Sequence, residues 1–231
     1  MRRKLYLTLN IILAAICYFG NYLYLTQGGI LLKSFASACF AMVGIVNLIF
    51  ALTGNLKGKV LRFPITMAIG LIMGMLGDIF INYNFVAGAA TFGLAHVFFL
   101  CGYFFIMPFS RRDIITTAIF FVPSVIFLMT SPALSFSVPA FKYVCLVYGF
   151  VLCSMAGKTL SMFTRKRNTV TTILLIGSFL FFFSDFMLLL NWFMGLGRTA
   201  ALLCMSTYYP AECLLGHAVF AYVLKNSELQ K

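Results

Sequence analysis

Three carboxylates and a histidine lie inside segments that are otherwise apolar enough to cross a membrane: Asp78, Asp185, Glu212 and His96. Placing a charged side chain in hydrocarbon costs roughly 3 kcal/mol on insertion scales, so such residues mark functional sites by default. A carboxylic acid in a low-dielectric site can hold a proton near neutral pH, while a second, ionised carboxylate stabilises a cation or activates water. These residue types therefore favour proton-transfer chemistry.

The composition is that of a membrane protein. Of the 231 residues, 62% are hydrophobic and 10% are charged, which excludes a soluble globular domain and a disordered chain. The seven cysteines stand singly, with no CxxC pair and no Cys/His group at zinc spacing, so we expect no metal and no cofactor. The net charge of +12 is interpreted as a topology signal, and we expect no nucleic-acid partner.

Apolar runs of about 20 residues predict an all-α bundle of eight transmembrane helices. The predicted spans are approximately residues 5–26, 34–54, 64–83, 89–109, 114–131, 141–163, 169–193 and 199–224. Because the connections are short, neighbouring helices should pack antiparallel, and residues 1–231 should form a single membrane domain.

The basic residues are distributed unequally between the two sides of this bundle. Only Lys33, Lys142 and Arg198 of the 17 Lys and Arg residues fall on one side, and Lys158 can reach the other side by snorkelling. The positive-inside rule then predicts that both termini are cytoplasmic. We expect a multi-pass protein of a bacterial inner membrane.

This topology converts sequence position into depth, at a rise of about 1.5 Å per residue. Asp78, His96 and Asp185 are expected roughly 8, 10 and 12 Å below the outer surface, with Glu212 near the midplane. The same argument places no Lys or Arg at their depth. The carboxylates therefore predict a water-filled or headgroup-binding cavity in the outer half of the bundle.

Three motifs, in order along the chain, resemble the YhhN family of membrane proteins. They are Gly77-Asp78 followed by F-x-x-G-x-x-x-F-x-x-x-H from Phe85 to His96, then G-x-x-x-F-x-x-S-D from Gly177 to Asp185, and Tyr208-Tyr209-Pro210-Ala211-Glu212. Two positions depart from the family pattern. The chain has Phe99 where an aromatic hydroxyl is expected, and Glu212 where Gln is expected.

The family includes lysoplasmalogenase, which hydrolyses the vinyl ether bond of lysoplasmalogens to a fatty aldehyde and a glycerophospho-alcohol. The resemblance implies this reaction here, with a lysophospholipid entering from the bilayer. Asp78 and Asp185 are the expected acid and base, in either order, and His96 is expected to hold a carboxylate or relay a proton. The expected substrate-lining residues are Glu212, Tyr208, Tyr209, Asn82 and Ser184.

Other functions use buried carboxylates as well. A proton-coupled transporter would spread its acids along a path across the membrane. An intramembrane aspartyl protease also needs two aspartates, but Met75 breaks the G-x-G-D pattern before Asp78. A non-enzymatic lipid-binding protein would keep the family fold, and Ser184 could then serve only as a hydrogen-bond partner between helices.

Overall fold

The computed structural model describes residues 2–54 and 56–228, which form eight α-helices and one short 3-10 helix, with no β-strand among them. The predicted all-α class is confirmed. The elements are α1 (Arg2–Gln27), α2 (Ile30–Thr53), η1 (Gly58–Leu61), α3 (Arg62–Phe80), α4 (Phe85–Ile106), α5 (Arg111–Thr130), α6 (Ala140–Arg165), α7 (Thr169–Met194) and α8 (Gly197–Glu228).

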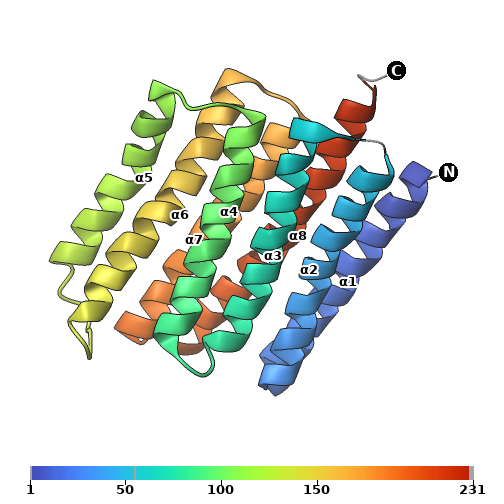
Figure 1. Cartoon of the computed structure of the whole chain (residues 1–231). Coiled ribbons are helices and arrows are strands. Elements are labelled where there is room, and N and C mark those ends of the chain that lie inside the picture. Colours follow the sequence, from blue (N-terminus) through green and yellow to red (C-terminus); the bar gives the residue numbers. More distant parts are fainter. Residues whose placement is uncertain (1, 55, 229–231) are drawn as a thin grey trace.

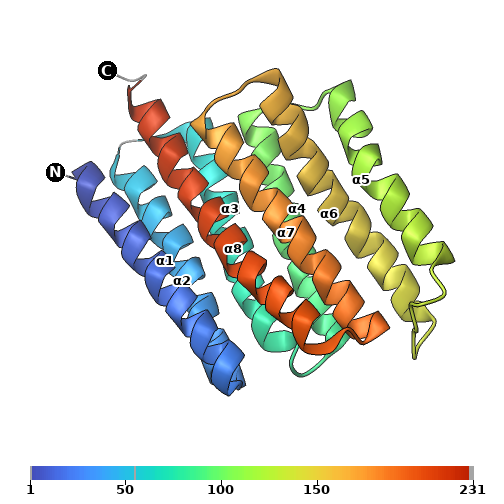
Figure 2. The same ribbon diagram turned by 180° about the vertical axis from the view of Figure 1, so that it is seen from behind.

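The helices pack as an up-and-down bundle with antiparallel neighbours along the chain. In Figure 1, α3 and α4 lie in front of α7 and α8, with α5 and α6 on one flank and α1 and α2 on the other. Figure 2 shows the same arrangement from behind. The start of α1 and the end of α8 lie at one end of the bundle, and the α1–α2, α3–α4 and α7–α8 connections lie at the other.

Seven of the helices, α1 to α7, are long and apolar enough to cross a membrane, which makes this a multi-pass membrane protein. Helix α8 is the longest at 32 residues and runs alongside α7. Its apolar character is reduced by polar residues inside the bundle, among them Glu212 and His217. The crossing of α8 and the cytoplasmic side of the termini stay predictions.

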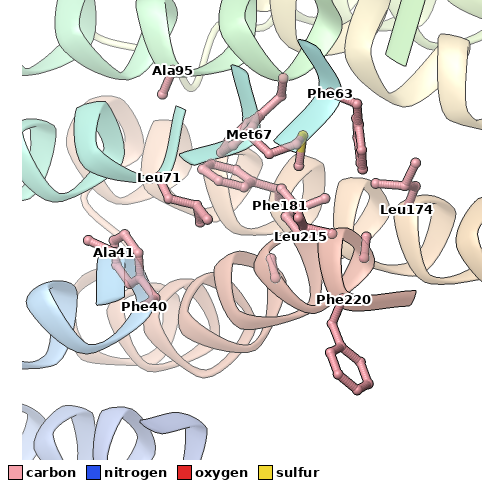
Figure 3. Close-up of a cluster of buried hydrophobic side chains, with 14 of the residues drawn as sticks. Phe40, Ala41, Phe63, Met67, Leu71, Ala95, Leu174, Phe181, Leu215 and Phe220 are labelled. Atoms are coloured by element: carbon pink, nitrogen blue, oxygen red, sulfur yellow. The ribbon is translucent and has the colours of Figure 1, made fainter. Parts of the chain in front are cut away.

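The core lies where α2, α3, α7 and α8 meet. Phe40, Leu71, Phe181 and Leu215 come from these four helices, and each is fully buried. Figure 3 shows these side chains in one apolar cluster. Burying a side chain of this size stabilises a fold by about 1.5–3 kcal/mol in water, and inside a membrane the same close packing acts through van der Waals contacts. This cluster supports the helices that carry the polar residues.

The connection between α3 and α4 is short and closely packed. Asn84 caps α4, since its side-chain oxygen accepts a hydrogen bond from the backbone N–H of Ala87 at 3.0 Å. The cap starts α4 at Phe85, a few residues before the predicted start of the span. A Cβ on Gly88 would lie 2.5 Å from Cα of Ile81, so the motif glycine is where the two backbones approach.

We expect Gly88→Ala to destabilise the protein by about 1–3 kcal/mol, because the added methyl group meets backbone that cannot move aside alone. The measurement is thermal unfolding of the purified protein in detergent. Gly93→Ala on the same helix is the matched control, because its nearest neighbouring atom, Cδ2 of Tyr148, would be 3.7 Å away. Equal melting temperatures for the two variants would contradict the close approach.

Candidate active site at the end of the bundle

A polar cavity of about 460 Å³ lies at the end of the bundle that holds the α1–α2 and α7–α8 connections. It lies between the ends of five helices, α1, α2, α3, α7 and α8, with Phe92 of α4 also in its wall. Its polar lining consists of Tyr24, Lys33, Asp78, Asn82, Ser184, Asp185, Asn191, Arg198 and Tyr208. Exposed residues such as Gly29 and Arg198 bring it to the molecular surface. Both predicted catalytic aspartates therefore line one space.

Asp78 forms a buried ion pair with a lysine. Its Oδ1 lies 3.1 Å from Nζ of Lys33, and the Ser37 hydroxyl donates a hydrogen bond to its Oδ2 at 2.5 Å. Only 6% of Lys33 is exposed. The expectation that no cation lies at the depth of the carboxylates was wrong. Lys33, near the start of α2, turns inward because the carboxylate offers a partner for its charge.

Asp185 belongs to a second cluster, built from α4, α6 and α7. The Tyr148 hydroxyl donates a hydrogen bond to Oδ2 of Asp185, and Nε2 of His96 lies 3.1 Å from the same oxygen. The His96 Nε2 is also 2.9 Å from the Tyr148 hydroxyl. The structure thus brings His96 to Asp185, and it adds a tyrosine that the sequence analysis did not single out.

His96 itself is fully buried and does not line the polar cavity. Its Nδ1 has no hydrogen-bond partner among the described residues. Because an unpaired buried N–H is costly, the geometry assigns the proton to Nε2, which has both acceptors beside it. A neutral His96 in this tautomer can fix the orientation of the Asp185 carboxyl group.

An apolar cavity of about 110 Å³ lies next to the polar one, between α4, α5, α6 and α7. Aliphatic and aromatic side chains make up most of its wall. The two cavities share a set of lining residues: Ile81, Phe92, Asp185, Leu188 and Trp192. Asp185 is the one carboxylate in this shared set, and Tyr148 lines the apolar side next to it.

The predicted substrate-lining residues separate into two groups. Tyr208, Asn82 and Ser184 line the polar cavity, whereas Tyr209 and Glu212 do not. The Tyr209 hydroxyl instead lies 3.4 Å from the backbone oxygen of Lys33. Glu212 is fully buried, and neither carboxyl oxygen has a hydrogen-bond partner within the described chain.

Gly74 makes room for the Glu212 carboxyl group, because a Cβ at position 74 would lie 2.5 Å from Oε1. Gly74 lies one helical turn before Asp78 on α3, and the absence of a side chain there leaves the space that the Glu212 carboxyl group occupies. The glutamate therefore lies behind the wall of the cavity.

Sequence analysis missed six residues of the site: Tyr24, Lys33, Ser37, Tyr148, Asn191 and Arg198. Lys33 and Arg198 had been assigned to topology alone, although each lies within a few residues of a predicted span end. The sequence did contain an indication for Tyr148, because its hydroxyl lies well inside an apolar span and needs a hydrogen-bond partner there. Within the described ranges, no group of three His, Cys, Asp or Glu side chains could hold a metal ion.

The helical bundle and its buried aspartates define a multi-pass membrane protein with a site open at one end, an arrangement consistent with a membrane enzyme. Comparison with known families identifies the group. The chain belongs to the YhhN family, whose sequence model matches residues 34–219 and so covers most of α2, all of α3 to α7 and much of α8. Comparison with curated proteins and with solved structures found no match.

Proposed function

We propose that this protein is a lysoplasmalogenase-like hydrolase, which cleaves the vinyl ether bond of a lysophospholipid drawn from the bilayer. The observation that carries the proposal is the meeting of a polar and an apolar cavity at Asp185. A lysoplasmalogen has one chain and one headgroup, and its vinyl ether bond joins the chain to the glycerol that carries the headgroup. The apolar cavity suits the chain, the polar cavity suits the headgroup, and the scissile bond then lies beside Asp185.

The first step is protonation of the alkenyl carbon that is not bonded to oxygen. We assign the proton to Asp185, because it lies at the junction of the cavities and both of its described hydrogen-bond partners approach the same oxygen, Oδ2. The electron pair of the double bond forms the new C–H bond, leaving an oxocarbenium ion. Asp78, paired with Lys33 at 3.1 Å, lines the same cavity, and its carboxylate can stabilise this cation.

Water then adds to the carbon bonded to oxygen and loses a proton to a carboxylate, which gives a hemiacetal. The hemiacetal collapses as its hydroxyl proton is removed, the bond to the glycerol oxygen breaks, and that oxygen is protonated. The products are a fatty aldehyde and glycerophosphoethanolamine or glycerophosphocholine. One water molecule is consumed and no redox step occurs, so the reaction requires no cofactor.

The remaining residues have distinct proposed roles. His96 is a positioning residue, because it is buried behind Asp185 and contacts the carboxyl group at 3.1 Å. Tyr208, Asn82 and Ser184 line the polar cavity and can contact the headgroup or the water. Tyr209 and Glu212, which line neither cavity, support the wall from behind.

We infer a single membrane domain with eight crossings and cytoplasmic termini, in the inner membrane of a bacterial cell. The basic residues support this orientation, since Arg2 begins α1, Lys57 precedes η1, Arg111 begins α5 and Arg165 ends α6. These helix ends lie with the start of α1 and the end of α8 at one end of the bundle (Figure 1). The cavity would then open toward the outer leaflet.

The alternative of a proton-coupled transporter is less well supported. Its acids should follow one another across the bundle, but Asp78 and Asp185 line one cavity at one end. Glu212, the next carboxylate inward, lies outside that cavity. A non-enzymatic lipid-binding protein would use the same two cavities, and measurement of product separates it from the enzyme.

The test is to incubate the purified protein with 1-alkenyl-lysophosphoethanolamine and to measure released aldehyde. We expect aldehyde and glycerophosphoethanolamine in equal amounts. The matched 1-acyl lysolipid should release no aldehyde, because an ester has no alkenyl carbon to protonate. Folded protein that releases no aldehyde from any vinyl ether lipid would refute the enzyme and leave the lipid-binding alternative.

A further inference from the structure

We propose that Arg198 binds the phosphate of the lysolipid, and that the protein selects its substrates by this phosphate and not by the amine of the headgroup. The inference rests on the proposed function and names the chemical group that the polar cavity recognises. It predicts that vinyl ether lysolipids with a phosphoglycerol headgroup, which carry no amine, are substrates as well.

The position of Arg198 supports a role in anion binding. Arg198 is exposed and lines the cavity where it reaches the surface. The ion pairs of the described residues join Lys33 to Asp78 and Lys158 to Asp113, and Asp185 contacts His96, so no described acidic side chain pairs with Arg198. A guanidinium group without a carboxylate partner can bind two phosphate oxygens at once.

The helix that carries Arg198 adds to this attraction. Arg198 is the second residue of α8, and Ala201, one turn later, also lines the cavity. The backbone N–H groups of a first helical turn have no partner within the helix and carry partial positive charge. Lys33, buried in the same cavity, contributes positive charge deeper inside, although Asp78 largely offsets it. The mouth of the cavity is therefore suited to a phosphodiester.

The carboxylates of the cavity are already engaged by protein groups. Asp78 pairs with Lys33 and Ser37, and Asp185 pairs with His96 and Tyr148. Along the described lining there is no third carboxylate. The ammonium group of ethanolamine or choline would find no unpaired acid there, so the amine contributes little selectivity.

The experiment compares four substrates with the same alkenyl chain: the phosphoethanolamine, phosphocholine and phosphoglycerol lysolipids, and alkenylglycerol without phosphate. We expect similar kcat/KM for the three phospholipids, within about threefold, and a fall of about 10- to 100-fold without the phosphate, the range for losing a charged hydrogen bond. Arg198→Gln should raise KM for the three phospholipids about 10- to 100-fold and leave kcat little changed. Arg198→Lys should recover part of the loss, and alkenylglycerol should be unaffected.

Lys142→Gln is the matched control. Lys142 is the remaining basic residue predicted on the side of the bundle where the polar cavity opens, and it lines neither cavity. An unchanged KM in Arg198→Gln would overturn the proposal. A preference of more than about tenfold for one amine headgroup would overturn it too. A preference for choline would point instead to the aromatic lining residues Tyr24 and Trp192.

A binding measurement tests the inference even if the protein releases no aldehyde. Trp192 is the single tryptophan of the chain and lines both cavities, so its fluorescence reports ligands directly. Saturated 1-O-alkyl lysophospholipids cannot be cleaved by vinyl ether protonation and serve as probes in nanodiscs. Arg198→Gln should weaken their binding about 10- to 100-fold and leave alkylglycerol binding unchanged. Binding without aldehyde release would refute the enzyme but support the phosphate site, whereas equal binding by variant and wild type would refute the site.

Discussion

Replacing Asp185 with asparagine is expected to lower the rate of aldehyde release on the order of 10²- to 10⁴-fold, the usual contribution of a positioned general acid. Asparagine keeps the size of the side chain and can still accept a hydrogen bond from the Tyr148 hydroxyl. It has no acidic proton to give to the alkenyl carbon. Binding of the saturated ether probe, followed by Trp192 fluorescence, should change little.

Two further variants define the roles around this carboxyl group. Asp78→Asn should cause a comparable loss of rate, since it removes the charge that stabilises the cation, and it also leaves Lys33 without its partner at 3.1 Å. Tyr148→Phe should have a smaller effect, because His96 still holds Asp185 at 3.1 Å.

The control for these substitutions is Asp113→Asn, which also alters a buried, ion-paired aspartate. It should lower stability while leaving the activity of the folded fraction unchanged, because Asp113 lines neither cavity. Full activity in both Asp78→Asn and Asp185→Asn would discard the proposed mechanism without discarding the reaction.

The largest expected effect on stability comes from the ion pair between α5 and α6. Nζ of Lys158 lies 2.7 Å from Oδ2 of Asp113 and 3.2 Å from the backbone oxygen of Pro108, and only 1% of Lys158 is exposed. Lys158→Met leaves the Asp113 carboxylate buried without its cation. We expect a loss of about 3–5 kcal/mol in the free energy of unfolding, measured in mixed detergent micelles.

A double-mutant cycle separates the interaction energy of the ion pair from the cost of leaving one buried charge without its partner. Lys158→Met combined with Asp113→Leu removes both charges and should recover most of the lost stability, because an apolar pair needs no desolvated partner. A double variant as unstable as Lys158→Met alone would show that the interaction energy lies elsewhere, for instance in the hydrogen bond to Pro108. Lys158 was expected to reach the more basic side of the bundle by snorkelling. Its ammonium group does reach Pro108 and Asp113 at that end, but it is buried beside Asp113 and not exposed.

The sequence determined the helices and the depth of their polar residues. Long apolar runs fold as helices because only a helix satisfies each backbone group within the segment. Each predicted range falls on one of the eight helices, with ends that differ by a few residues. Rise per residue then placed Asp78, His96 and Asp185 at similar depth, and both aspartates do line one cavity.

Tertiary structure alone decided which side chains meet. Depth along a helix follows from counting residues, but the direction of a side chain depends on how each helix is rotated against its neighbours. This rotation brings Lys33 from α2 to Asp78 and Tyr148 from α6 to Asp185, and it turns Glu212 away from the cavity. Such contacts join side chains of different helices, even of helices that follow one another in the chain, and they depend on how the bundle packs as a whole, which no single segment specifies.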